Sequence, residues 1–255
     1  MATYDVAQLP ELLKNNEYPG RGIVIGKSAD GQSIAIAYFI MGRSANSRNR
    51  VFTEDGDTVT IYPADASKVE DPSLIIYSPI RKIGDNLIVT NGDQTDTIYD
   101  FLKDGNTFEE ALETREFEPD GPNWTPRISG LVMLDDSDRY KMSILKAQDA
   151  EGTDCARYTY SYKLQNGLGH FIHTYKQNGN PIPTFEGEPE RVAIPNSADE
   201  FAEEKEPGMF LVHGNGEATI SGTVNVDGDF ATDVNAKIVI NTAAEVAGAI
   251  FGNIE

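Results

Sequence analysis

The sequence is poor in cysteine and histidine, and each shortage excludes a kind of chemistry. Its single cysteine, Cys155, excludes a disulfide within the chain and favours a reducing compartment such as the cytoplasm. There are only three histidines. His170 and His173 lie three residues apart in a predicted strand, so their side chains point to opposite faces. We therefore expect neither a metal site nor metal catalysis.

The shortage of basic residues excludes most polyanionic partners. The chain has 21 Lys and Arg residues against 41 Asp and Glu residues, which gives a formal net charge of -20. The electrostatic field of such an acidic protein repels nucleic acid and anionic membrane surfaces. No long apolar run is present, and Asp5 and Glu11 interrupt the start of the chain, so we expect no signal peptide and no membrane span. The sequence leaves open whether the protein is a homo-oligomer.

A local cluster of arginines differs from this acidic background. Residues 42–50 read Gly-Arg-Ser-Ala-Asn-Ser-Arg-Asn-Arg and contain no carboxylate. Guanidinium groups bind phosphate oxygens through paired hydrogen bonds, and hydroxyl and amide groups can complete the shell. The segment therefore predicts an anion clamp, although each arginine alone could equally pair with a carboxylate elsewhere in the chain.

The hydrophobic pattern predicts one α+β domain over residues 1–255. Apolar runs on either side of Ala29-Asp30-Gly31 indicate a β-hairpin, and later strands recur between Gly and Asp turns. The predicted strands are 22–26, 33–40, 50–53, 58–62, 74–83, 87–90, 128–134, 140–147, 156–164, 170–176 and 208–213, with β-like alternation over 215–240. The predicted helices are 5–16, 98–102, 108–117, 197–206 and 242–251. Successive helices among strands favour an α layer on a sheet.

Polar loops at strand ends carry the candidate chemistry. Residues 91–97 follow a buried strand directly, and residues 117–127 hold three prolines and the only tryptophan, which makes that loop stiff. Neither a P-loop nor a dinucleotide fingerprint is present, because Gly20-Arg21-Gly22 precedes a strand instead of following one. Together with Tyr77 these loops fit a phosphorylated polar small molecule and proton transfer without a cofactor.

Five motifs occur in a fixed order along the chain. They are Tyr-Pro-Gly-Arg-Gly at 18–22, Gly-Arg-Ser at 42–44 with Ser-Arg-Asn-Arg at 47–50, Thr-Asn-Gly-Asp-Gln-Thr-Asp-Thr-Ile at 90–98, Phe-Glu-Pro-Asp at 117–120 and Thr-Pro-Arg-Ile at 125–128. The chain closely resembles the archaeal-type IMP cyclohydrolase family and its bacterial relatives in these motifs, over roughly residues 18–195. From about residue 196 no motif matches, so the C-terminal part is divergent.

The resemblance implies an Ntn-hydrolase-like four-layer αββα sandwich with mostly antiparallel sheets. It also implies an enzyme that needs no cofactor and cyclises 5-formamidoimidazole-4-carboxamide ribotide to IMP, with loss of water, in purine biosynthesis. One alternative is a non-catalytic purine-nucleotide binding protein on the same scaffold. Another is a different cyclase or amidohydrolase that acts on a related ribotide.

By resemblance and chemistry together, Tyr77 and Glu118 are the candidate acid and base, and Arg48 is the candidate for the phosphate or the developing oxyanion. The candidate substrate-binding residues are Arg21, Arg43, Ser44, Arg50, Asn91, Asp93, Thr95 and Arg127. Structural roles stay open for several of them. These roles are ion pairs for the arginines and for Glu118, core packing for Tyr77, and turn formation for residues 91–95.

Overall fold

The computed structural model describes residues 4–14, 16–32, 34–41, 49–55, 58–63, 65–69, 76–133, 138–196, 218–226, 230–238 and 249–254. Most of the predicted anion clamp, at residues 42–48, lies outside these ranges. So do the helix predicted at 197–206 and the strand predicted at 208–213. No helix in the described ranges is long and apolar enough to cross a membrane.

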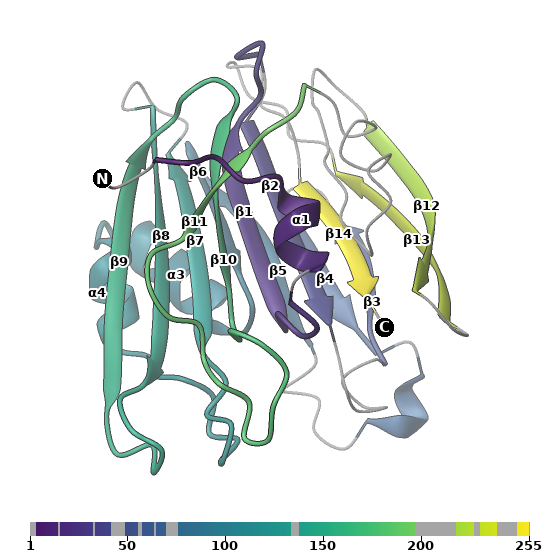
Figure 1. Cartoon of the computed structure of the whole chain (residues 1–255). Coiled ribbons are helices and arrows are strands. Elements are labelled where there is room, and N and C mark those ends of the chain that lie inside the picture. Colours follow the sequence, from purple (N-terminus) through teal and green to yellow (C-terminus); the bar gives the residue numbers. More distant parts are fainter. Residues whose placement is uncertain are drawn as a thin grey trace.

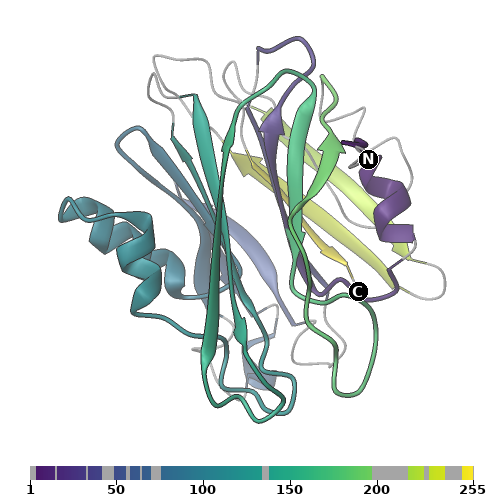
Figure 2. The ribbon, with the colours of Figure 1, turned by 60° about the vertical axis from the view of Figure 1, so that its left-hand side comes forward.

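Two β-sheets pack face to face (Figure 1 and Figure 2). The seven-stranded sheet runs in the order β3 (Val51–Asp55), β4 (Thr58–Tyr62), β5 (Tyr77–Ile83), β6 (Asn86–Thr90), β7 (Arg127–Met133), β8 (Arg139–Ala147) and β9 (Cys155–Lys163). The five-stranded sheet runs in the order β11 (Glu190–Ala193), β10 (Leu168–His173), β1 (Arg21–Lys27), β2 (Ile34–Met41) and β14 (Ala249–Ile254). Strands β12 (Ala218–Val226) and β13 (Phe230–Ile238) form a separate hairpin.

Nearly all of these strands pair antiparallel, and β14 joins β2 in parallel. The core between the two large sheets is apolar because alternate side chains of each strand point inward. Ile23 and Ile36 come from one sheet, and Val89, Ile128 and Ile144 come from the other. The phenol-bearing residues Tyr38 and Tyr77 belong to the same buried cluster.

Helices cover the outer faces of the sandwich (Figure 2). Helices α3 (Gln94–Lys103) and α4 (Phe108–Glu113) pack Ile98, Phe108 and Leu112 against β6, β7 and β8. Helix α4 begins with the predicted capping box, in which Thr107 Oγ1 accepts from Glu110 N at 3.2 Å. Helix α1 (Leu9–Lys14) lies on the outer side of the five-stranded sheet, and a short 3₁₀ turn, η1 (Ala66–Lys68), follows β4.

The α+β prediction is confirmed, but several predicted boundaries are wrong. Helix α1 is shorter than the predicted 5–16, and β10 ends at His173 instead of residue 176. Helix α3 begins at Gln94, so much of the predicted loop 91–97 is its first turn, where Thr95 Oγ1 bonds the carbonyl of Gly92. Helix α4 ends at Glu113 instead of reaching residue 117. The helix predicted at 242–251 is wrong in its last residues, because residues 249–251 belong to β14. Residues 242–248 of that prediction lie outside the described ranges, and residues 249–251 pair with β2 as a strand.

Gly20 lies in a backbone conformation that its surroundings reserve for glycine. Its φ is 78°, and a Cβ there would overlap Thr174 Oγ1 and lie 2.5 Å from Tyr175 Cδ2. We expect Gly20→Ala to lower the free energy of unfolding by about 1–2 kcal/mol for the backbone and by a further about 1–3 kcal/mol for the overlap. Denaturant unfolding measures both.

Gly105→Ala is the matched control, because Gly105 has a φ of 82° and a Cβ added there would meet nothing within 4 Å. It should show the backbone cost alone. Equal losses for the two variants would contradict the close packing of Gly20 against Thr174 and Tyr175.

Candidate active site

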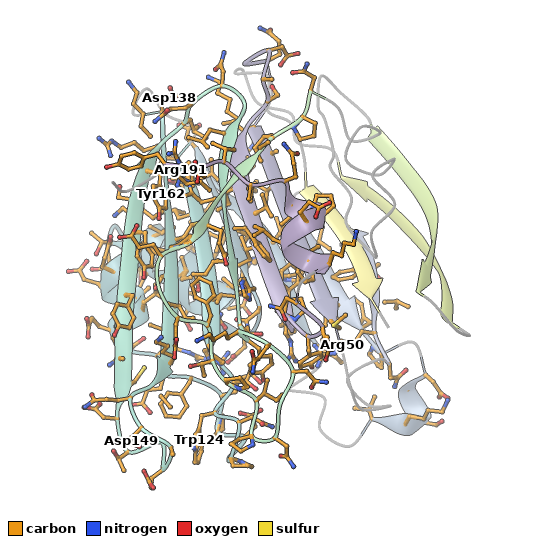
Figure 3. The ribbon with its side chains drawn as sticks, viewed as in Figure 1. Arg50, Trp124, Asp138, Asp149, Tyr162 and Arg191 are labelled. Carbon is orange, nitrogen blue, oxygen red and sulfur yellow. The ribbon has the colours of Figure 1, made fainter. Side chains whose placement is uncertain are left out.

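A buried polar cluster lies between the two sheets, toward one end of the sandwich. Arg21 opens β1, Tyr38 lies in β2, Tyr77 opens β5, and Arg50 immediately precedes β3. All four residues are buried, and the phenol oxygens of Tyr38 and Tyr77 lie 2.7 Å apart. Figure 3 shows Arg50 in the lower half of the molecule, with Trp124, whereas Tyr162 and Arg191 lie toward the top. The structure therefore brings together three of the predicted site residues, Arg21, Arg50 and Tyr77.

Glu118 joins this cluster from the loop between α4 and β7. Its backbone N–H donates to the carbonyl of Thr125 at 2.8 Å, which closes the loop. Its negative charge acts to raise the pKa values of Arg21, Arg50 and Tyr77. The structure thus places the two predicted acid–base residues around one pair of guanidinium groups.

Burial raises the pKa of Glu118 because a charged carboxylate loses its hydration there. Arg21, Arg127 and Arg50 act in the opposite direction without cancelling this effect, and the neighbouring Asp120 adds to it. Glu118 can therefore hold a proton at a higher pH than an ordinary glutamate.

The pKa values of the two phenols are also raised. Burial is the largest cause for both, and the mutual repulsion of the two phenolate forms adds to it for Tyr38. Arg50 and Arg21 act to lower the pKa of Tyr77, but the raised value persists. At neutral pH Tyr77 therefore keeps its proton and can donate a hydrogen bond.

The two arginines respond differently to the same surroundings. Burial acts to lower the pKa of Arg21, but Glu118 and the phenols of Tyr175, Tyr77 and Tyr38 outweigh it, so the pKa is raised. Burial and the charge of Arg21 together lower the pKa of Arg50. Arg21 Nε is buried and has no hydrogen-bond partner among the described residues. This donor is available to an anion within the sandwich.

Arg50 is held in place by the residue before it. Asn49 Nδ2 donates to the carbonyl of Asp65 at 2.7 Å, and Asn49 Oδ1 accepts from the N–H of Asp65 at 2.6 Å. This pair of hydrogen bonds ties the end of the arginine-rich segment to the turn before η1. Arg43, Ser44 and Arg48, which belong to the same segment, lie outside the described residues.

Arg127 lies at the start of β7, facing the N-terminal turn of α3. Its Nη1 is 2.7 Å from Asp93 Oδ1 and donates to Gln94 Oε1, also at 2.7 Å. Burial acts to raise the pKa of Asp93, but Arg115 and Arg127 outweigh it, so the pKa is lowered. The same guanidinium also acts on Glu118. Arg127 thus links the α3 turn to the cluster electrostatically.

The polar side chains of Asn91 and Thr95 bond to groups of the protein itself. Asn91 Nδ2 donates to the carbonyl of Pro126, and its Oδ1 accepts from the N–H of Ile128, both at 2.9 Å. Thr95 Oγ1 lies 2.6 Å from Thr90 Oγ1. These contacts agree with the structural alternative left open for residues 91–95, and a contact with substrate stays a prediction.

Sequence reasoning did not single out four residues of this region, namely Tyr38, Asp120, Thr125 and Tyr175. Tyr38 lies in an apolar run that is typical of a buried strand, so nothing separated it from the core. Asp120 and Thr125 lie in two of the five motifs that carry the family resemblance, whereas Tyr175 lies in none of them. Those motifs could have drawn attention to Asp120 and Thr125. The contact between Thr125 and Tyr175 could not be predicted, because the two residues are 50 positions apart in the sequence.

The fold and the cluster define an α+β protein of two packed sheets that holds arginines, tyrosines and a carboxylate where water is largely excluded. Such a site suits an anionic molecule and proton transfer. The family model described as "IMP cyclohydrolase-like protein" matches residues 18–212. The chain therefore belongs to this family.

Archaeal relatives agree with this assignment. The IMP cyclohydrolase of Methanococcus aeolicus is 31% identical over 163 residues, which cover 62% of this chain and 74% of the relative. That of Methanothrix thermoacetophila is 32% identical over 174 residues, covering 67% and 80%. One from Methanococcus maripaludis is 36% identical over 163 residues, covering 62% and 75%.

Proposed function

We propose that this protein is an IMP cyclohydrolase, which closes 5-formamidoimidazole-4-carboxamide ribotide to IMP with loss of water in purine biosynthesis. The observation that carries the proposal is the burial of Arg21 beside Glu118 and Tyr77 in a member of this family. The archaeal relatives that bear this name support the same activity.

The reaction needs proton transfer and charge stabilisation, and no covalent intermediate. The carboxamide nitrogen attacks the formyl carbon, a C–N bond forms, and one carboxamide proton passes to the formyl oxygen to make a hydroxyl group. The formamido nitrogen then loses its proton, the C–O bond breaks as a C=N bond forms, and the hydroxyl group leaves as water. Glu118 removes the N–H proton and returns it to the departing hydroxyl, a role that its raised pKa supports. Tyr77, still protonated, donates to the formyl oxygen as negative charge develops there.

Arg21 and Arg50 supply positive charge for the ribotide. Together with Arg43, Ser44 and Arg48 they bind the phosphate or the developing oxyanion. Holding the two ring substituents against each other supplies much of the acceleration, since an oriented intramolecular reaction is worth about 7 kcal/mol or more.

The predicted contacts of Asn91, Asp93 and Thr95 with the carboxamide and formyl groups stay proposals. Their hydrogen bonds within the protein support a second role, in which the α3 turn fixes Arg127. In this role Arg127 influences the reaction indirectly, because its charge acts to lower the pKa of Glu118.

The two packed sheets with helices outside support an Ntn-hydrolase-like four-layer αββα sandwich as the finer fold assignment. The single cysteine supports a cytoplasmic enzyme.

Turnover decides between an enzyme and a nucleotide-binding protein on the same scaffold. Purified protein incubated with the formamido ribotide should form IMP, followed by its ultraviolet absorbance, in amounts far above those of the protein itself. Tight binding of IMP by calorimetry without any turnover would contradict the proposed activity and favour the binding protein.

A further inference from the structure

Asp120, Thr125 and Tyr175 form a chain of hydrogen bonds that leads into the candidate site. Thr125 Oγ1 donates to Asp120 Oδ2 at 2.5 Å, and the phenol oxygen of Tyr175 lies 2.6 Å from the same Thr125 Oγ1. Thr125 and Tyr175 are buried, whereas Asp120 is only partly buried. The chain therefore runs from the partly buried Asp120 in the 118–125 loop to the buried phenol of Tyr175, which acts electrostatically on Arg21.

The direction of this chain follows from the single proton of a hydroxyl group. A carboxylate can only accept, so the Thr125 proton is used in the bond to Asp120. Thr125 Oγ1 must then accept the proton of Tyr175. The proton of Tyr175 consequently points toward Thr125, and the remaining lone pairs of its phenol oxygen are left as acceptors.

Tyr175 is held beside Arg21 by its surroundings. The N–H of Arg21 donates to Thr174 Oγ1 at 3.1 Å, and the Tyr175 ring is stacked on Tyr18 with a centroid distance of 5.5 Å. The phenol of Tyr175 acts to raise the pKa of the Arg21 guanidinium. An acceptor oxygen is thus fixed next to the buried guanidinium.

Asp120 also holds the loop that carries Glu118. Its Oδ1 accepts from the backbone N–H of Thr125 at 2.6 Å, and the carbonyl of Thr125 accepts from the N–H of Glu118 at 2.8 Å. One carboxylate therefore fixes both the candidate acid–base residue and the orientation of Tyr175.

We propose that Asp120 is a positioning residue which, through Thr125, presents the phenol oxygen of Tyr175 as a hydrogen-bond acceptor for an N–H group of the bound ribotide. Tyr175 is then a further substrate contact. The inference rests on the proposed function, because the ligand it invokes is the formamido ribotide or its product IMP, and both carry N–H donors.

The test is a double-mutant cycle on the Michaelis constant for the ribotide and on the dissociation constant for IMP. Tyr175→Phe removes the acceptor and keeps the ring, so both constants should rise about tenfold, as expected for one buried hydrogen bond. Asp120→Asn keeps the shape but lets an amide donate to Thr125, which reverses the chain and turns the Tyr175 proton toward the ligand. Both constants should rise by a similar factor.

Because both substitutions act through one oxygen atom, Asp120→Asn should weaken IMP binding in the Tyr175→Phe background by less than about twofold. Thr125→Ser should recover most of the affinity that Thr125→Val loses. If the effects of Asp120→Asn and Tyr175→Phe multiply, the inference is overturned.

A pH profile separates positioning from a general loss of structure. Burial is the main cause of the raised pKa of Glu118, and the charge of Asp120 adds to it. In Asp120→Asn the limb of the kcat/KM profile that Glu118 governs should therefore move to lower pH. The other charged or titratable groups that act on Glu118 are Arg21, Arg50, Arg127 and Tyr77, and they are unchanged in this variant.

Asp149→Asn is the matched control. Asp149 caps Thr153 in the same manner, through its backbone N–H and its hydroxyl, but lies in an exposed turn between β8 and β9. It should leave both constants and the pH profile unchanged. The IMP constants test the inference even if no turnover is found, so the failure of the proposed activity and the failure of this inference are distinguishable.

Discussion

Replacement of Glu118 by glutamine is expected to lower kcat for IMP formation by about 10² to 10⁴, the range that general acid–base catalysis contributes. Glutamine keeps the size of the side chain and removes its ability to exchange a proton. The affinity for IMP should stay within about tenfold, because the carboxylate acts in the transition state. Steady-state kinetics and calorimetry measure the two effects separately.

Glu116→Gln is the matched control, since Glu116 is an exposed residue of the same loop. It should retain the activity of the unaltered protein. If Glu118→Gln lowers affinity and turnover by the same factor, the acid–base role of Glu118 is wrong and the carboxylate serves binding alone.

Replacement of Arg21 by methionine should raise the Michaelis constant for the ribotide by about 30-fold to 1,000-fold. Loss of one partner from a buried charged contact costs about 2–4 kcal/mol, and each 1.4 kcal/mol is about tenfold in affinity. Methionine fills a similar volume without the guanidinium group. Substrate-saturation kinetics give the Michaelis constant directly.

Arg21 also supplies the largest of the opposing influences on the pKa of Glu118, so that pKa should rise further in the variant. The corresponding limb of the pH profile should move to higher pH. Arg139→Met, at an exposed residue that opens β8, is the control and should change neither quantity. An unchanged Michaelis constant in Arg21→Met would remove Arg21 from the ribotide site.

The sequence predicted the parts of the fold that depend on neighbouring residues. Alternating or continuous apolar runs between Gly and Asp turns identified most strands, and the Thr107 and Glu110 capping box identified the start of α4. The pairing of β14 with β2 could not be predicted in this way, because it joins segments that are far apart in the sequence, such as Ala249 and Ile36. Strand β11 is short and was not predicted.

The candidate site was predictable only in part. The family resemblance drew attention to Arg21, Tyr77 and Glu118, and the structure gathers them at one end of the sandwich. Tyr38 could not be told from a core residue, because it lies in an apolar run of the sequence. Its hydrogen bond to the phenol of Tyr77 is visible only in the structure. The direction of the Asp120 chain depends on three hydroxyl and carboxyl groups in contact, which only the folded structure brings together.

A crystal structure of the protein with bound IMP tests the central claim most directly. We expect the nucleotide between the two sheets, with a phosphate or carbonyl oxygen within hydrogen-bond distance of Arg21 and the purine ring near Glu118 and Tyr77. Binding of IMP on an outer face of the sandwich, with Arg21 untouched, would contradict the account.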